Sequence, residues 1–196
     1  MSNKIDYYFN NHLEHKINAI LKYKNITYIG IDNSKYMLKM AKKNKFNKHK
    51  YFINYNYDNL NKLNKNFDII TSFYCSLCYT KNIEKNLKSI SKILSKNGYF
   101  IFSYFNKNIL ENLQLNILYK DKQINYNGIW EHQNEITYYH EKIYDKRNLI
   151  YENLHQLYII ENIRNILTKY FIIIEESNYK KLLNAKDEIL FILQKK

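Results

Sequence analysis

The chain has 196 residues, 45% of them hydrophobic, which fits a single domain with a sizeable core. No stretch approaches the roughly 20 continuous apolar residues that a membrane helix needs, and residues 1–11 are too polar for a secretory signal. Two cysteines, Cys75 and Cys78, exclude a multi-bridge disulfide scaffold, so we expect a cytoplasmic protein without a membrane partner.

The net charge of +13 suggests a nucleic acid as a partner, because clustered cations gain affinity for phosphate by releasing condensed counterions. Only Arg147 and Arg164 among the 31 basic residues are arginine, however, and the lysines are scattered. Lys, Asn, Ile and Tyr are all abundant while Pro is absent, which is typical of coding bias in an A+T-rich genome. Weak nucleic-acid binding through a Lys-rich surface therefore stays open as an alternative.

Strands alternate with helices through the first half of the chain. Apolar periodicity and β-branched runs predict helices over 5–21, 35–42 and 82–94, and strands over 26–31, 51–55, 67–73 and 99–104. Asp32, Asn33 and Ser34 suit the cap of the second helix, and Gly98 is expected to take the left-handed conformation at the end of the third. This alternation predicts an α/β fold with a doubly wound, mostly parallel sheet.

The last part of the chain differs in character. Residues 116–158 read as a β-rich insertion, in which aromatic-rich runs over 136–144 and 149–158 flank a turn and predict a β-hairpin. A helix over 159–168 and strands over 170–175 and 188–194 complete the expected fold. The final pair of strands is expected to be antiparallel. No linker or repeat divides the chain, so we expect one domain over residues 1–196.

Asp32 is the first candidate functional residue. In an open α/β sheet the ligand lies outside the carboxyl ends of the strands, where an acidic residue can bind both ribose hydroxyls of a nucleoside. An Asp that follows a strand can instead cap the next helix. Both interpretations stand at this point.

Several segments together resemble a known family. Residues 28–34 read YIGIDNS and are followed by Met37, Leu38 and Ala41; further matches are YDNL at 57–60, FDII at 67–70, SFYCSLCY at 72–79 and LSKNGYFIF at 94–102. In order and spacing these resemble the successive strand motifs of the class I S-adenosylmethionine-dependent methyltransferases. The resemblance implies a Rossmann-like fold and S-adenosylmethionine as cofactor.

The resemblance also implies roles for individual residues. Asp32 would hold the ribose and Asp58 the adenine amino group, and the residues implied on the cofactor side are Asp32, Asn33, Met37, Asp58, Asn59, Phe73 and Tyr74. Aromatic rings there can stabilise a sulfonium by cation–π attraction. The tail resembles that of enzymes that methylate small molecules, which implies His155 and Tyr158 as catalytic residues and Ser76, Tyr79 and Trp130 on the acceptor side. His155 is the candidate base, because imidazole titrates near neutrality.

One departure from the family concerns glycine. The glycine-rich loop that follows the family's first strand has no counterpart here, since the only glycines are Gly30, Gly98 and Gly128. Either the chain starts late or its cofactor site is degraded. Besides methyl transfer to a small molecule, the sequence therefore leaves open an inactive remnant or partner subunit, and an RNA-directed, cap-type methyltransferase or basic RNA-binding protein.

The remaining polar clusters are expected to be structural. Cys75 and Cys78 have thioredoxin-like spacing but lack further signs of a redox or zinc site, and we expect two buried thiols. His12 and His15 are expected on a solvated helix face, without a metal. Glu131, His132, His140 and Glu141 lie in an alternating β segment and are expected to face water. The oligomeric state is left open.

Overall fold

The computed structural model describes residues 27–43, 50–73, 76–80, 82–105, 113–119, 122–133, 136–178 and 188–196. The chain forms two compact units, Met1–Asn59 and Leu60–Lys196. The helix predicted over 5–21, with His12 and His15, lies outside the described residues. The single domain over 1–196 stays a prediction.

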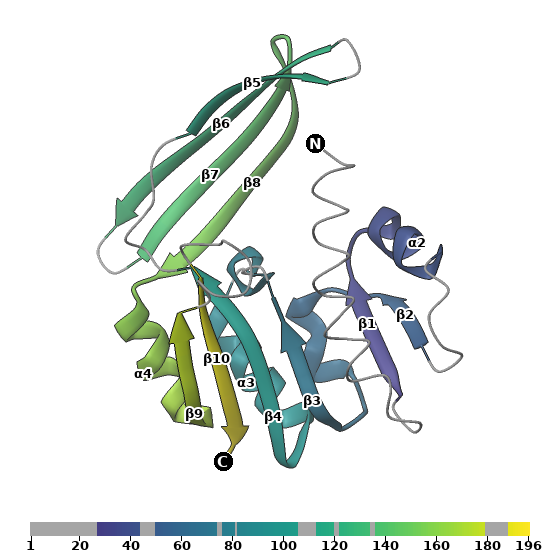
Figure 1. Cartoon of the computed structure of the whole chain (residues 1–196), viewed down its shortest axis with the longest axis vertical. Helices are drawn as coiled ribbons and strands as arrows, with labels where there is room; N and C mark the ends of the chain where they lie inside the picture. Colours follow the sequence, from purple (N-terminus) through teal and green to yellow (C-terminus); the bar gives the residue numbers. More distant parts are fainter. Residues whose placement is uncertain are drawn as a thin grey trace. The chain divides into compact units, whose positions relative to one another are not determined.

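The first unit contains a parallel strand–helix–strand motif (Figure 1). Strand β1 (Tyr28–Asp32) pairs with β2 (Lys50–Asn54), and helix α2 (Lys35–Lys43) comes between them in the chain. All three elements were predicted to within two residues at each end. Gly30 serves the pairing, because a Cβ there would lie 2.8 Å from Cδ1 of the Phe52 ring on β2. Leu38 is the buried residue of α2.

The second unit is built on a four-stranded sheet with the order β3-β4-β10-β9. Strands β3 (Phe67–Ser72) and β4 (Leu94–Phe105) are parallel, while β10 (Glu188–Lys195) runs antiparallel to both β4 and β9 (Phe171–Asn178). The structure thus confirms the α/β class and the antiparallel C-terminal strand. It has three separate sheets in the described residues, rather than one continuous sheet.

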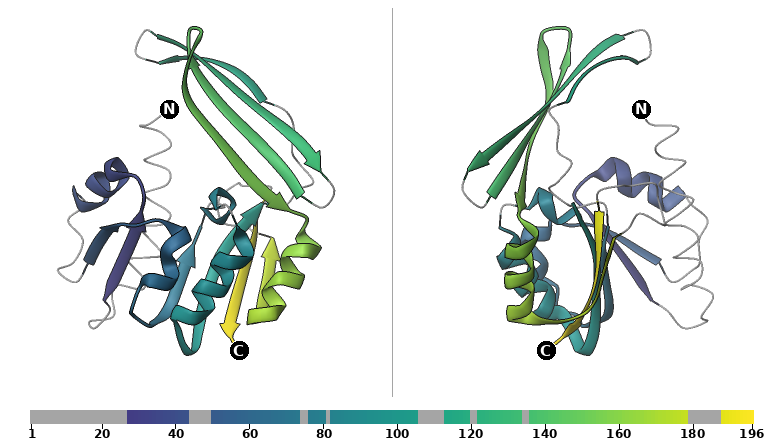
Figure 2. Two further views of the ribbon diagram at one scale, coloured as in Figure 1. Left: turned by 180° about the vertical axis from the view of Figure 1, so that it is seen from behind. Right: turned by 60° about the vertical axis from the view of Figure 1, so that its left-hand side comes forward.

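Helices α3 (Ile83–Ile93) and α4 (Ile160–Tyr170) cover one face of this sheet, as Figure 2 shows. The core beneath them is aromatic: Phe100, Phe102 and Tyr104 alternate along β4 and are fully buried. The ring of Phe102 stacks on Phe100 at a centroid distance of 4.9 Å and on Phe191 of β10 at 5.1 Å. This alternation of buried rings fixes which face of β4 the helices cover.

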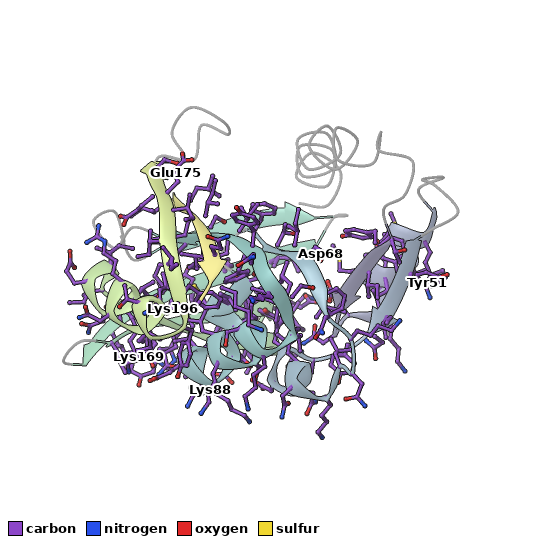
Figure 3. All side chains as sticks on the ribbon, turned by 90° about the horizontal axis from the view of Figure 1, so that it is seen from below. Tyr51, Asp68, Lys88, Lys169, Glu175 and Lys196 are labelled. Carbon is purple, nitrogen blue, oxygen red and sulfur yellow. The ribbon has the colours of Figure 1, made fainter. Side chains whose placement is uncertain are left out.

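Figure 3 labels Lys88 and Lys169 on the helical side of the unit. Lys169 of α4 forms an ion pair of 2.8 Å with Glu84 of α3, which joins the two helices at their surface. No helix among the described residues is long and apolar enough to cross a membrane.

The end of α3 corrects one expectation. Asn82 caps its start as predicted, since the Asn82 side chain accepts a hydrogen bond of 2.8 Å from the Lys85 N–H. Beyond its end, however, the left-handed residue is Asn97, with a φ of 64°, and Gly98 has no positive φ. Asn tolerates this conformation, while Gly98 is needed for close packing, because a Cβ there would lie 3.1 Å from the carbonyl oxygen of Asp68.

The β-rich insertion is a four-stranded antiparallel sheet, which we call the insertion sheet. Strands β7 (Ile136–Asp145) and β8 (Asn148–Tyr158) confirm the predicted hairpin. The first two strands, β5 (Leu113–Tyr119) and β6 (Lys122–Gln133), were not predicted as strands. Asparagine is depleted in strands, and the one in β5 and the two in β6 weaken the pattern there.

A buried tyrosine joins the insertion sheet to the main sheet. The hydroxyl of Tyr104, at the end of β4, accepts a hydrogen bond of 2.8 Å from the Tyr158 N–H, and donates one of 3.4 Å to the Tyr158 carbonyl. Burial raises the pKa of Tyr104 far above its usual value. The hydroxyl therefore stays protonated and satisfies both backbone groups of Tyr158.

Replacing Tyr104 by Phe tests this connection. Tyr104→Phe keeps the ring but leaves the Tyr158 N–H without its acceptor, which we expect to lower the free energy of unfolding by about 1–3 kcal/mol. Urea denaturation followed by circular dichroism measures the change. Tyr99→Phe on the same strand, where 39% of the residue is exposed, is the matched control and should change stability by less than about 0.5 kcal/mol. Equal effects of the two substitutions would contradict the proposed connection.

Candidate functional site

The turn after β1 is organised by Asp32. Its Oδ1 accepts a hydrogen bond of 2.7 Å from the Ser34 N–H, and Ser34 Oγ in turn accepts one of 3.3 Å from the Met37 N–H. The capping interpretation of this segment is thus confirmed. The other oxygen, Asp32 Oδ2, makes no hydrogen bond within the residues that the structure describes. The half-buried carboxylate therefore keeps one acceptor for a ligand.

Asn54, at the end of β2, holds this turn in place, a role that the sequence analysis missed. Its Nδ2 donates to the carbonyl oxygens of Asp32, at 3.1 Å, and of Asn33, at 2.8 Å. The Tyr55 N–H donates to the same Asp32 carbonyl at 3.0 Å. The register pairs Asn54 directly with Asp32, so a residue at the end of the neighbouring parallel strand was the available signal.

The other residues expected on the cofactor side in this unit follow β1 and β2. Asp58 lies in the first turn of the 3-10 helix η1 (Tyr57–Lys62), and its N–H donates to Asn56 Oδ1 at 2.9 Å. The carbonyl of Asn59 accepts a hydrogen bond of 2.9 Å from the Tyr55 hydroxyl. Asn33 is exposed in the turn and Met37 is exposed on α2. These four residues therefore follow the carboxyl ends of two parallel strands, where α/β folds bind ligands.

A basic surface lies on the same unit. Lys35, Lys39 and Lys42 occur on α2 at a spacing that places them on one side of the helix, and with Leu38 and Asn54 they line an open hollow of about 620 Å³. None of the three lysines forms an ion pair with another described residue. The hollow therefore offers positive charge to an anionic ligand.

In the second unit, the segment after β3 is shaped by Ser76. Its hydroxyl donates to the carbonyl of Phe73 at 2.6 Å, and its N–H donates to the same oxygen at 3.3 Å. This turn leads into the 3-10 helix η2 (Ser76–Tyr79), whose Leu77 and Cys78 are buried while Tyr79 is 53% exposed. Tyr74 lies outside the described residues.

Cys78 corrects the expectation of two buried thiols, because it is disulfide-bonded. The chain's other cysteine, Cys75, lies outside the described residues. In the described part of the chain, no cluster of three or more His, Cys, Asp or Glu side chains is placed to hold a metal ion.

One side of the insertion sheet carries tyrosines around a carboxylate, and we call this side the tyrosine face. The register aligns Tyr126 with Ile143 and Tyr151, and Gly128 with Glu141 and Asn153. Besides burial, the charge of Glu141 is one cause of the raised pKa of both Tyr126 and Tyr151. Tyr126 and Tyr139 also share a hydrogen bond of 2.5 Å between their hydroxyls.

The 3-10 helix η2, which carries Tyr79, contacts strand β8 of the insertion sheet. The pKa of Tyr79 is raised to about 12, chiefly by burial and then by the nearby Glu141, Tyr151 and Tyr139. Burial and the hydrogen bond with Tyr139 likewise raise the pKa of Tyr126 far above its usual value. The structure thus brings an acceptor-side residue predicted from the sequence, Tyr79, together with four residues that the sequence analysis did not select: Tyr126, Tyr139, Glu141 and Tyr151.

The two sides of the insertion sheet separate the acidic residues. Glu131 lies 3.4 Å from His140 and Glu152 lies 3.1 Å from Lys142, all on the side opposite the tyrosine face. Glu131 and His140 are partly exposed, as expected. Glu141 is half-buried, as His140 is, and lies on the tyrosine face.

The register shows where three predicted residues lie along the insertion sheet. The backbone of Tyr139 pairs with Trp130 of β6 and with His155 of β8. The backbone of Tyr158, the last residue of β8, is bound by the hydroxyl of Tyr104. The roles of Trp130, His155 and Tyr158 stay predictions.

Comparison with known proteins identifies the family. A family model described as a methyltransferase domain matches residues 11–186. The chain belongs to this family. Its resemblance to the class I S-adenosylmethionine-dependent methyltransferases is thereby confirmed, and S-adenosylmethionine is the methyl donor of such enzymes. No curated protein matches the sequence.

Solved structures agree on the fold. An S-adenosylmethionine-dependent methyltransferase from Clostridium acetobutylicum is similar at a TM-score of 0.63 and 18% identity, covering 98% of each chain. An amino pentose methyltransferase from Micromonospora echinaspora, solved with bound S-adenosylmethionine, is similar at a TM-score of 0.61 and 13% identity, over 94% of this chain and 78% of that one. A sugar N-methyltransferase from a Streptoalloteichus species has a TM-score of 0.59 and 11% identity, covering 95% and 77%.

The position of Tyr79 against Glu141 predicts its titration. A tyrosine with a pKa of about 12 should be mostly protonated at about pH 11, where a tyrosine of ordinary pKa near 10 is mostly ionised. Because the pKa in the folded state lies above the ordinary value, the associated stability is present below about pH 10 and is lost as the pH rises towards 12. Carbon-13 NMR of labelled tyrosine measures the titration, and the signal that is missing in Tyr79→Phe is assigned to Tyr79.

Glu141→Gln should lower the pKa of Tyr79, because it removes a negative charge beside the hydroxyl. Glu152→Gln, on the other side of the sheet, is the control and should leave the titration unchanged. An unchanged Tyr79 titration in Glu141→Gln would contradict the contact.

Proposed function

We propose that this chain transfers the methyl group of S-adenosylmethionine to a small-molecule acceptor, with Asp32 bound to the ribose and Asp58 to the adenine amino group. The observation that carries this proposal is the half-buried carboxylate of Asp32 after β1, in a chain that belongs to a methyltransferase family. Asn33, Met37, Asn59, Phe73 and Tyr74 complete the proposed cofactor side.

The chemistry of Asp32 fits the ribose of such a cofactor. A ribose presents two neighbouring hydroxyl donors, and a carboxylate is an acceptor-only group with two oxygens. Oδ1 is oriented by the Ser34 N–H, and the carbonyls of Asp32 and Asn33 are fixed by Asn54. The free acceptor is thus presented by a turn held at two points, so that little conformational freedom is lost on binding.

The cofactor supplies an electrophilic methyl group on a sulfonium, so the protein needs no covalent nucleophile. Its contribution is to orient the acceptor and to exclude water. Support for a small acceptor comes from the similar structures, which include an amino pentose methyltransferase and a sugar N-methyltransferase. Ser76, Tyr79, Trp130 and His155 are proposed for the acceptor side, and His155 for removal of a proton from the acceptor. Tyr158, whose N–H donates to the Tyr104 hydroxyl, is proposed as the second catalytic residue.

Binding of the cofactor tests the proposal directly. Asp32→Asn keeps an oxygen that can accept from the Ser34 N–H but removes the charge, so we expect the Kd for S-adenosylmethionine to rise at least about tenfold, which corresponds to about 1.4 kcal/mol. Calorimetric titration of the full chain measures this change.

Ser34→Ala is the matched control for that substitution. It removes the hydrogen bond to the Met37 N–H and should cost about 1 kcal/mol of stability without a change in Kd. A wild-type chain that binds no S-adenosylmethionine would overturn the proposal in favour of an inactive remnant. Equal affinity of Asp32→Asn and the wild type would overturn the role of Asp32.

The lysines of α2 favour a second candidate, a nucleic acid as the methyl acceptor. Each phosphate contact makes the slope of log affinity against log salt more negative by about 0.7 for single strands. Replacing Lys35, Lys39 and Lys42 by Gln should therefore make the slope for single-stranded RNA less negative by about 2. Filter binding at several salt concentrations measures it, and the same change at Lys85, Lys88 and Lys92 of α3 is the control. Equal slopes for both triple variants would remove this candidate.

A further inference from the structure

The tyrosine face combines one carboxylate with a surrounding wall of phenol rings. Glu141 of β7 lies between its pairing partners, Gly128 on β6 and Asn153 on β8. Tyr126 and Tyr151 both pair with Ile143, two positions from Glu141 on the same side of the sheet, and η2, which carries Tyr79, contacts β8. Besides burial, the charge of Glu141 contributes to the raised pKa of all three tyrosines. Four tyrosines from three strands and from η2 therefore meet at one acidic group.

Gly128 makes this arrangement sterically feasible. A Cβ at that position would lie 1.8 Å from the hydroxyl oxygen of Tyr139 and 2.5 Å from its Cζ. The Tyr139 ring thus extends across β6 over the backbone of Gly128 and reaches Tyr126. Any larger residue at position 128 would displace the ring, so the glycine serves the cluster itself.

The cluster is open to a ligand on one side. Tyr79 is 53% exposed and Tyr151 is 42% exposed, while Glu141, Tyr126 and Tyr139 are half-buried beneath them. Tyr79 belongs to η2, which follows the carboxyl end of β3. In open α/β sheets this end of the strands is where ligands bind.

The chemistry of the cluster selects for a cation. Tyrosine rings attract cations through their negative faces, and a carboxylate at the centre adds a formal negative charge. The chain as a whole carries 31 Lys and Arg residues against 18 Asp and Glu residues, so its general field repels a cation. A positively charged ligand therefore needs a local negative site in this chain, and Glu141 with the surrounding tyrosine rings provides one.

We propose that the tyrosine face is the binding site for the methyl acceptor and that this acceptor is a small molecule with a protonated amine, held by Glu141 and by the rings of Tyr79 and Tyr151. The inference rests on the proposed function for the identity of the ligand as a methyl acceptor. For transfer, the bound ammonium first loses its proton to the base proposed above, His155. The nitrogen lone pair then forms the new N–C bond, while the bond between methyl carbon and sulfur breaks and leaves its electron pair on sulfur.

The experiment titrates the full chain with tetramethylammonium and, separately, with tert-butanol, a neutral molecule of similar shape. Carbon-13 NMR of labelled tyrosines follows both titrations, with the Tyr79 and Tyr151 signals assigned through Phe variants. We expect both tyrosine signals to shift on addition of tetramethylammonium, with a Kd at least about tenfold lower than the Kd for tert-butanol.

Variants place the binding on the tyrosine face. Glu141→Gln keeps the size of the side chain and an oxygen that can accept hydrogen bonds but removes the charge, and should raise the Kd for tetramethylammonium about tenfold. Tyr151→Leu keeps an apolar side chain in the strand and should raise it about fivefold. Glu152→Gln makes the same charge change on the opposite side of the sheet, and its Kd should stay within about twofold of the wild type.

The outcomes separate this inference from the proposed function. Titration of the same samples with S-adenosylmethionine reports on the cofactor site alone. The first outcome to consider is that the cofactor binds but the cation site fails its test. That is so if tetramethylammonium binds no better than tert-butanol, or if Glu141→Gln binds tetramethylammonium as well as the wild type does. The proposed amine site is then wrong, and the proposed function stands. If only the cation binds, with the dependence on Glu141 described above, the site is a cation site and the proposed function fails.

Discussion

The hydrogen bonds between the Tyr104 hydroxyl and the backbone of Tyr158 set the geometry of the larger unit. Tyr104 ends a row of buried rings on β4, and its hydroxyl is as deeply buried as they are. A hydroxyl in such a position is costly unless both its donor and its acceptor are used. Tyr158, the last residue of β8, uses both, so these hydrogen bonds attach the insertion sheet to the main sheet at a defined residue. The side of β8 that meets η2 follows from that attachment.

The register of the insertion sheet then decides which residues act together. Side chains along a strand alternate between two sides, so a shift of one residue would exchange the tyrosine face for the charged side. With the observed register, Tyr126, Tyr139, Glu141 and Tyr151 share one side, and the Glu131–His140 and Glu152–Lys142 pairs share the other.

The sequence predicted well what depends on local pattern and poorly what depends on pairing. The β1–α2–β2 motif and α3 were found because capping residues and apolar periodicity act within a few residues, as the hydrogen bonds of Ser34 and Asn82 show. Strands β5 and β6 were missed because their asparagines hide a pattern that is stabilised only across the sheet. For the same reason, the tyrosines around Glu141 were not predicted as a cluster. Its environment comes from Tyr126 on one neighbouring strand, Tyr151 on another and Tyr79 on η2, and none of these contacts is local in sequence.

Asp32 shows that a structural and a functional interpretation of one residue need not compete. From sequence, its carboxylate was either a cap for the turn into α2 or a ligand for a sugar diol. The structure gives one oxygen to the Ser34 N–H and leaves the other without a hydrogen bond in the described residues. The capping bond orients the carboxylate, and Asn54 fixes the two carbonyls beside it, so the second oxygen is presented in one direction. The same hydrogen bond that stabilises the turn therefore lowers the entropic cost of binding at the other oxygen, and capping becomes part of how such a site works.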